Sequence, residues 1–147
     1  MQLKPTTCTV TNPVINVVMP AIKSNALGGI NGTSAVQPFA INLDCPLAGP
    51  KVYVTLTDAT TPGNTGSTLS LANGSTATGV GLQVLSGSTV VSYGPDSAVA
   101  GNLNQWQAGT SAGTAMSIPL GVRYIQTASS MGAGLVKGAA TFTISYR

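Results

Sequence analysis

Apolar and polar residues alternate along several short segments of the chain, which is the pattern of half-buried β-strands. The clearest segment is 140–146, where every second residue is apolar and every residue between is threonine or serine. Stretches of good helix-forming residues are absent, because glycine and proline interrupt them. The other principal strands are predicted, with turn residues between them, over 14–19, 39–43, 51–57, 79–85 and 116–127.

The connections between these segments are rich in glycine, asparagine, serine and threonine, which favour turns. Two shorter strands are predicted at 68–71 and 89–91. The longest connection, 94–114, is polar and predicts a surface loop. No internal repeat or linker divides the 147 residues, so the pattern predicts one all-β domain, a β-sandwich.

The charged residues exclude most catalytic chemistry. Only 6% of the residues are charged, and the chain has three acidic residues and no histidine. Catalytic triads and zinc sites that need histidine are therefore ruled out. The acids Asp44, Asp58 and Asp96 are too widely spaced in sequence to indicate a site. We therefore predict a protein that is not an enzyme and that has no cofactor or metal site.

The net charge of +3 and the pI near 9.1 do not indicate a nucleic-acid partner. The six basic residues are isolated from one another, whereas phosphate binding needs several on one face. Trp106 lies in a polar segment, where an aromatic ring could stack on a sugar. A tryptophan that covers one end of a sandwich is the more common arrangement, so Trp106 is a weak sugar-contact candidate.

The two cysteines, Cys8 and Cys45, fit no metal-binding or redox motif, which leaves a disulfide or two free thiols. The low charge and the abundance of threonine, serine and glycine are typical of a secreted protein and favour the disulfide. Closing a loop of this length would contribute about 4 kcal/mol to stability in the chain-entropy description.

The segment 140–146 is too apolar for the edge of a sheet, yet the six principal strands leave none to lie beside it. A missing strand would leave unpaired backbone groups and a hydrophobic groove, which a strand from another chain can fill. The alternative is that the weak segment 89–92 completes the sheet. On the first strand one face is wholly apolar, whereas Asn16 interrupts the other, and Pro13 makes Val10 a weaker candidate. The predicted groove residues are Ile15, Val17, Met19, Phe142, Ile144 and Tyr146.

Several elements occur in a characteristic order: Cys8 opens the first strand and Cys45 closes the second. They are followed by 79–85, 122–127 and 138–147, the last with a tyrosine in the penultimate position. On these elements the chain resembles, from Cys8 to Arg147, the pilin domains of bacterial chaperone–usher fimbriae. The resemblance implies an incomplete immunoglobulin-like sandwich that lacks its seventh strand and has a Cys8–Cys45 disulfide.

The resemblance also implies the partners and the location. A periplasmic chaperone fills the groove first and anchors the C-terminal carboxylate, here that of Arg147. After passage through the outer-membrane usher, the N-terminal extension of an adjacent subunit takes its place in the fimbria on the cell surface.

The segment before Cys8 departs from ordinary fimbrial subunits, because it is too short and too polar to serve as a donor extension. A subunit that only accepts a strand belongs at the tip, where a pilin domain follows a receptor-binding lectin domain. We therefore expect 1–7 to be a linker remnant and 8–147 to be the pilin domain that anchors a tip adhesin for cell adhesion. Any host receptor would bind the upstream lectin domain. The alternatives are an ordinary subunit without its extension and a self-contained sugar-binding sandwich that uses Trp106.

Overall fold

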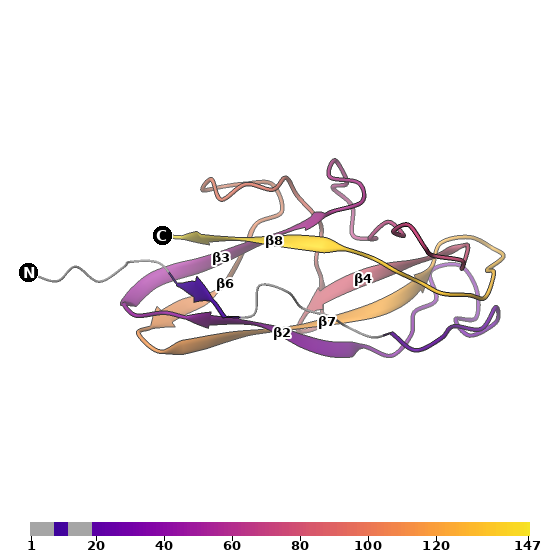
Figure 1. Cartoon of the computed structure of the whole chain (residues 1–147), viewed down its shortest axis with the longest axis horizontal. Helices are drawn as coiled ribbons and strands as arrows, with labels where there is room; N and C mark the ends of the chain where they lie inside the picture. The colour runs from indigo at the N-terminus through magenta and orange to yellow at the C-terminus, as the bar shows by residue number, and fades with distance from the viewer. Residues whose placement is uncertain (1–7, 12–18) are drawn as a thin grey trace, which may run out of the picture.

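The computed structural model describes residues 8–11 and 19–147, and it is all-β over that range (Figure 1). The strands form two sheets, with the orders β1-β2-β7-β4-β5 and β6-β3-β8. This confirms the predicted two-sheet sandwich. The strands are β1 (Thr9–Val10), β2 (Gln37–Asp44), β3 (Ala48–Asp58), β4 (Val80–Ser86), β5 (Thr89–Val90), β6 (Trp106–Ala112), β7 (Ala115–Gln126) and β8 (Ala140–Tyr146).

The core lies between the two sheets, where the alternating apolar residues of the strands meet. Ile41 of β2 and Val52 and Val54 of β3 are completely buried, and so is Tyr93, which follows β5. Burial of each such aliphatic side chain is worth about 1.5–3 kcal/mol. Strand β3 is the central strand of its sheet, so its inner face holds the core on that side.

The disulfide joins the start of the described chain to the end of β2. Cys8 and Cys45 are bonded with their Cα atoms 4.2 Å apart, which confirms the expected pairing. Directly after Cys8, β1 pairs antiparallel with the end of β2, so that Val10 lies opposite Leu43. The first principal strand was expected over 14–19, and of it only Met19 lies within the described residues, outside any strand.

The prediction that 94–114 is a surface loop is wrong for its second half. Residues 106–112 form β6, which pairs antiparallel with β3 at the edge of the three-stranded sheet. The sequence of β6 is dominated by small and polar residues, so it has no apolar alternation that would indicate a strand. The expected strand at 68–71 is reduced to an isolated bridge between Leu69 and Leu82.

The weak segment near residue 90 does form a strand, but not beside β8. Strand β5 pairs with β4, at the outer edge of the five-stranded sheet. The alternative in which 89–92 completes the sheet next to 140–146 is therefore wrong.

A buried carboxylate organises the connection after β3. Asp58 is fully covered and accepts hydrogen bonds from the backbone N–H groups of Thr60, Thr61 and Ser70 and from the Asn64 amide, all at 3.0–3.1 Å. Burial tends to raise the pKa of this carboxyl group, but the hydrogen bonds that stabilise the charged form outweigh it and hold the pKa below its ordinary value.

Candidate functional site

The inner face of β8 is less covered than that of its neighbour β3. Phe142, Ile144 and Tyr146 all pack against the core but remain only partly buried. They lie opposite three residues of β3, namely Leu56, Val54 and Val52, which are 4%, 0% and 0% exposed. Over the described residues, the core is therefore fully covered at β3 and only partly covered at β8, one strand further along the same sheet.

The backbone of β8 is fully paired on one edge. It pairs with β3 without a register shift from Asp58↔Ala140 to Val52↔Tyr146. The pairing continues one residue further, because Arg147 and Lys51 exchange backbone hydrogen bonds of 2.9 and 2.6 Å. Among residues 8–11 and 19–147, β3 is the only strand paired with β8.

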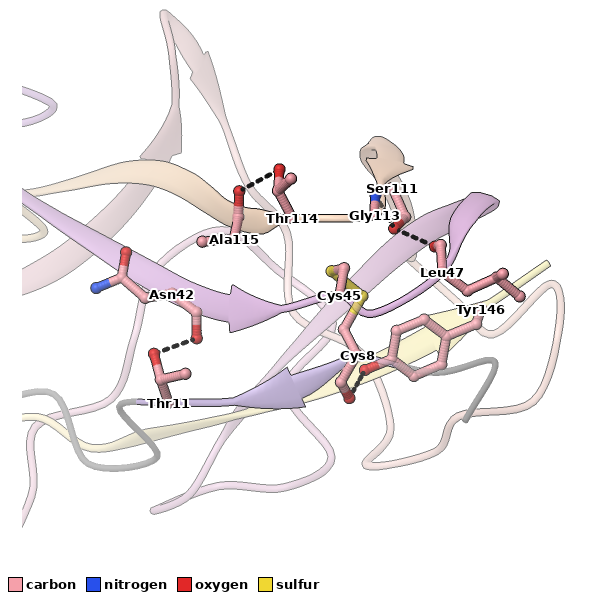
Figure 2. The surroundings of a disulfide bond; sticks show 10 residues. All are labelled: Cys8, Thr11, Asn42, Cys45, Leu47, Ser111, Gly113, Thr114, Ala115 and Tyr146. Atoms are coloured by element: carbon pink, nitrogen blue, oxygen red, sulfur yellow. Dashed lines mark hydrogen bonds between the residues drawn. A yellow bond between two sulfur atoms is a disulfide. The ribbon is translucent and has the colours of Figure 1, made fainter. Parts of the chain in front are cut away.

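The end of β8 contacts the disulfide. The Tyr146 hydroxyl donates a hydrogen bond of 2.7 Å to the carbonyl oxygen of Cys8, and Figure 2 shows the ring lying beside the Cys8–Cys45 bond. Val10, two residues further along, also packs against the core while partly exposed. Burial raises the pKa of the Tyr146 hydroxyl, so it stays protonated and donates at neutral pH.

The segment that leads into β8 contacts a second part of the N-terminal region. Ile22 is buried and forms a β-bridge with Gly134, and Met19 packs against the core while partly exposed. The described parts of the N-terminal region, 8–11 and 19–22, thus contact the C-terminal region at residues 146 and 134, near its two ends. A partner strand that covers β8 would run between these two contact points.

The structure brings four of the six predicted groove residues to partly buried positions on the core: Met19, Phe142, Ile144 and Tyr146. Ile15 and Val17 lie outside the described residues. No sequence pattern indicates Ile22 and Val136, which also pack on the core near the start of β8. The bridge between Ile22 and Gly134 joins segments without alternating patterns, so the sequence gives no signal for it.

Arg147 extends the β3–β8 pairing and places its side chain on the outer face of the three-stranded sheet. Its guanidinium group donates a hydrogen bond to Oε1 of Gln105 and lies 4.0 Å from the ring centroid of Tyr53. A cation over an aromatic face in this range is a stabilising contact. The last residue is therefore fixed both by its backbone and by its side chain.

Trp106 begins β6 opposite Val54 and packs against the core while partly exposed. Its indole N–H is buried and has no hydrogen-bond partner in the described part of the chain. The ring borders a hollow of about 310 Å³ that Val90, Ser92 and Asn104 also line. Trp106 thus packs on the core at the β6 edge of the three-stranded sheet, opposite the middle of β3.

The described residues contain no group of three or more histidine, cysteine or acidic side chains that could hold a metal ion. No helix in the described range is long and apolar enough to cross a membrane.

A family model described as "Fimbrial protein" matches residues 1–147. The chain is similar to the F17c-G and F17b-G fimbrial adhesins of Escherichia coli. Each is 41% identical over 145 residues, a match that covers 97% of this chain and 42% of the adhesin. The chain thus spans well under half of these curated relatives.

Solved structures of pilus proteins share the fold. The CupB6 tip adhesin of Pseudomonas aeruginosa has a TM-score of 0.75 at 24% identity, with 97% of this chain and 41% of the adhesin covered. A subunit in a chaperone–usher pilus structure that concerns rod uncoiling has a TM-score of 0.71 at 15% identity, with 100% and 94% covered. At these identities the likeness is one of fold.

Proposed function

The chain belongs to the fimbrial protein family, and on that premise we propose that it is a strand-accepting pilin domain with a structural, non-catalytic role. The observation that carries the proposal is the half-covered inner face of β8, where Phe142, Ile144 and Tyr146 border a core that is complete at β3. A donated strand would pair with the edge of β8 opposite β3 and cover these side chains.

The acceptor groove has two sides in this proposal. Phe142, Ile144 and Tyr146 form the side on β8, while Met19, together with Ile15 and Val17 from outside the described range, forms the other. Each aliphatic or aromatic side chain that the donor strand covers contributes about 1.5–3 kcal/mol, to which the backbone ladder adds. Several such contacts together give tight and slowly dissociating binding.

The place of the domain in the fimbria is at the tip. One observation supports this: the curated relatives are adhesins more than twice as long as this chain. In this proposal 1–7 is the remnant of a linker, and 8–147 is the pilin domain that joins a receptor-binding lectin domain to the fimbria. An ordinary fimbrial subunit without its extension is the alternative.

The partners follow from the same role. The groove would accept a strand of the periplasmic chaperone first, and the strand of an adjacent subunit after passage through the outer-membrane usher to the cell surface. The chaperone would also bind the C-terminal carboxylate of Arg147. Contact with a host receptor would be made by the lectin domain alone.

Strand acceptance is tested with a synthetic peptide that has Val, Ile or Leu at every second position and Thr, Ser or Asn between. About fifteen residues suffice, since extended chain rises 3.3 Å per residue and the groove follows residues 134–146. Thermal unfolding of the purified chain is measured with this peptide and with a scrambled peptide of the same composition. We expect a large, slowly reversing rise in Tm with the alternating peptide and no rise with the scrambled peptide.

An unchanged Tm with both peptides, for a chain that is already stable and monomeric, would overturn the proposal. The self-contained sugar-binding sandwich would then become the better interpretation. Titration with neutral monosaccharides, followed by Trp106 fluorescence, would test the hollow beside that ring.

A further inference from the structure

The outer face of the three-stranded sheet is polar, and its central part is buried. An antiparallel sheet of a sandwich usually exposes this face to solvent. Here Thr55 and Thr57 of β3 are 0% and 3% exposed, and Ser145 of β8 is 6% exposed. On β8 the polar face is buried at Ser145 and partly buried at Thr143, whereas Thr141 is exposed.

Residues 94–105, which we term the cover loop, lie across this face and rise above β8 in Figure 1. At β3, Gly94 is tied by its backbone to Leu56, and its carbonyl oxygen accepts a hydrogen bond of 2.8 Å from Thr57 Oγ1. Further along, Asn102 Nδ2 donates to Thr55 Oγ1 at 3.2 Å and also to two carbonyl oxygens within the loop. The cover loop is thus anchored on the central strand of the sheet.

The cover loop also contacts β8 at two places. Thr143 Oγ1 donates a hydrogen bond of 2.6 Å to the carboxylate of Asp96, and the Arg147 guanidinium donates to Gln105 Oε1. Gln105 is held in turn by Gly101 N–H and by the Val99 carbonyl oxygen at 3.3 Å. A hydrogen bond to a carboxylate is about twice as strong as one between neutral groups. The cover loop therefore holds the middle and the end of β8 through hydrogen bonds on its polar face.

We propose that Asp96 and Gln105 are positioning residues for strand acceptance: through Thr143 and Arg147 they hold β8 extended, so that its edge opposite β3 is ready to pair. This inference rests on the proposed function and adds the part of the chain that prepares the groove. An edge strand with a half-covered apolar face loses conformational entropy when a partner orders it. A strand that is held in place beforehand binds faster and more tightly, because that entropy is not lost on binding.

The test uses Thr143→Val, which removes the hydroxyl group at constant shape, and Thr143→Ser, which retains it. We expect Thr143→Val to weaken binding of the alternating peptide about fivefold, mainly through slower association, as the loss of one such hydrogen bond predicts. Thr143→Ser should bind like the wild type. Amide hydrogen exchange of β8 in the free protein should be faster in Thr143→Val.

The matched control is Ser34→Ala, which removes a hydroxyl bonded to the Tyr124 N–H at 2.9 Å on the other sheet. Ser34→Ala should lower Tm without a change in peptide association. The double variant Asp96→Ala with Thr143→Val should bind the alternating peptide no more weakly than either single variant does. The reason is that both substitutions remove the same contact.

Unchanged peptide kinetics and unchanged β8 exchange in Thr143→Val, while the wild type binds the peptide, would overturn this inference alone. The inference would also be overturned if Ser34→Ala slowed peptide association as much as Thr143→Val does. The slower association would then be a result of lower overall stability. Failure of the wild type to bind the peptide would overturn the proposed function and this inference with it.

Discussion

The Tyr146 hydroxyl donates its hydrogen bond to the carbonyl oxygen of Cys8, so the end of β8 is joined to the residue that also carries the disulfide. Cys8 thus connects the C-terminal strand to β1 and β2. This contact lies at one end of the groove that we propose, and the Ile22–Gly134 bridge lies near the other end.

Removal of this hydroxyl by Tyr146→Phe should lower the free energy of unfolding by about 1 kcal/mol, because the ring contacts stay and one hydrogen bond is lost. Urea unfolding at pH 7 measures the loss. Tyr53→Phe is the control, since the Tyr53 hydroxyl makes only a 3.5 Å contact with Gln107 and should contribute little. Equal losses in the two variants would contradict a specific role for the Cys8 contact.

Replacement of both cysteines by serine should remove about 4 kcal/mol of stability, because the Cys8–Cys45 bond restricts the unfolded chain. That is a large share of the total of roughly 5–15 kcal/mol for a domain of this kind. Thermal unfolding of the double variant and of the reduced wild type should give similar results. A reduced wild type as stable as the oxidised protein would contradict the prediction.

Ile144→Ala distinguishes a groove residue from an ordinary core residue. In the free protein the half-buried side chain should contribute only about 1 kcal/mol, whereas the affinity for the alternating peptide should fall about tenfold. The matched variant is Val54→Ala, opposite Ile144 and fully buried, which should cost about 2–3 kcal/mol of stability in the free protein. Chemical unfolding and peptide titration of both variants separate the two roles.

Asp58→Asn should destabilise the fold at pH 7 by about 2 kcal/mol, because one amide cannot replace a carboxylate that accepts four hydrogen bonds. The pKa of this carboxyl group is lowered in the folded protein. Its contribution is therefore fully present above the ordinary value near 4 and is lost as pH falls through the lowered folded value.

Unfolding in urea between pH 7 and pH 2 should show the difference between wild type and Asp58→Asn shrinking at the acid end. Asp44→Asn is the control, because Asp44 is exposed. A constant difference over the whole pH range would contradict the assignment to this carboxylate.

Alkaline pH should destabilise the protein through its buried tyrosines. Burial raises the pKa of the Tyr93, Tyr124 and Tyr146 hydroxyls, and the charge of Asp58 adds to the effect at Tyr93. The unfolded chain loses these protons at about pH 10 and the folded chain only above that, so stability is full below about 10 and declines as pH rises further. Tyr93→Phe should flatten this decline between pH 9 and 11.5.

The alternating pattern of 140–146 was sufficient to predict β8 and its inward face. Local sequence specifies such a strand, because successive side chains point to opposite faces of the sheet and every second residue therefore lies on the same face. The same reasoning failed for β6, because its residues are mostly small or polar and its strand form depends on pairing with β3.

Long-range contacts could not be predicted from local patterns either. The alternating polar residues of β3 are typical of a face that is exposed to solvent. In the structure, however, the cover loop buries Thr55 and Thr57. The contacts that do this join residues about 40 positions apart through single hydrogen bonds. Nothing in the composition of 94–105 specifies which strand it lies on.

The ladder between β3 and β8 has seven residue pairs and no register shift, whereas the ladder between β3 and β6 has two shifts. A tensile load applied along β8 would therefore act in shear on all rungs at once, rather than peel them one by one. In a filament the regular ladder would transmit the pull into the central strand and the core behind it.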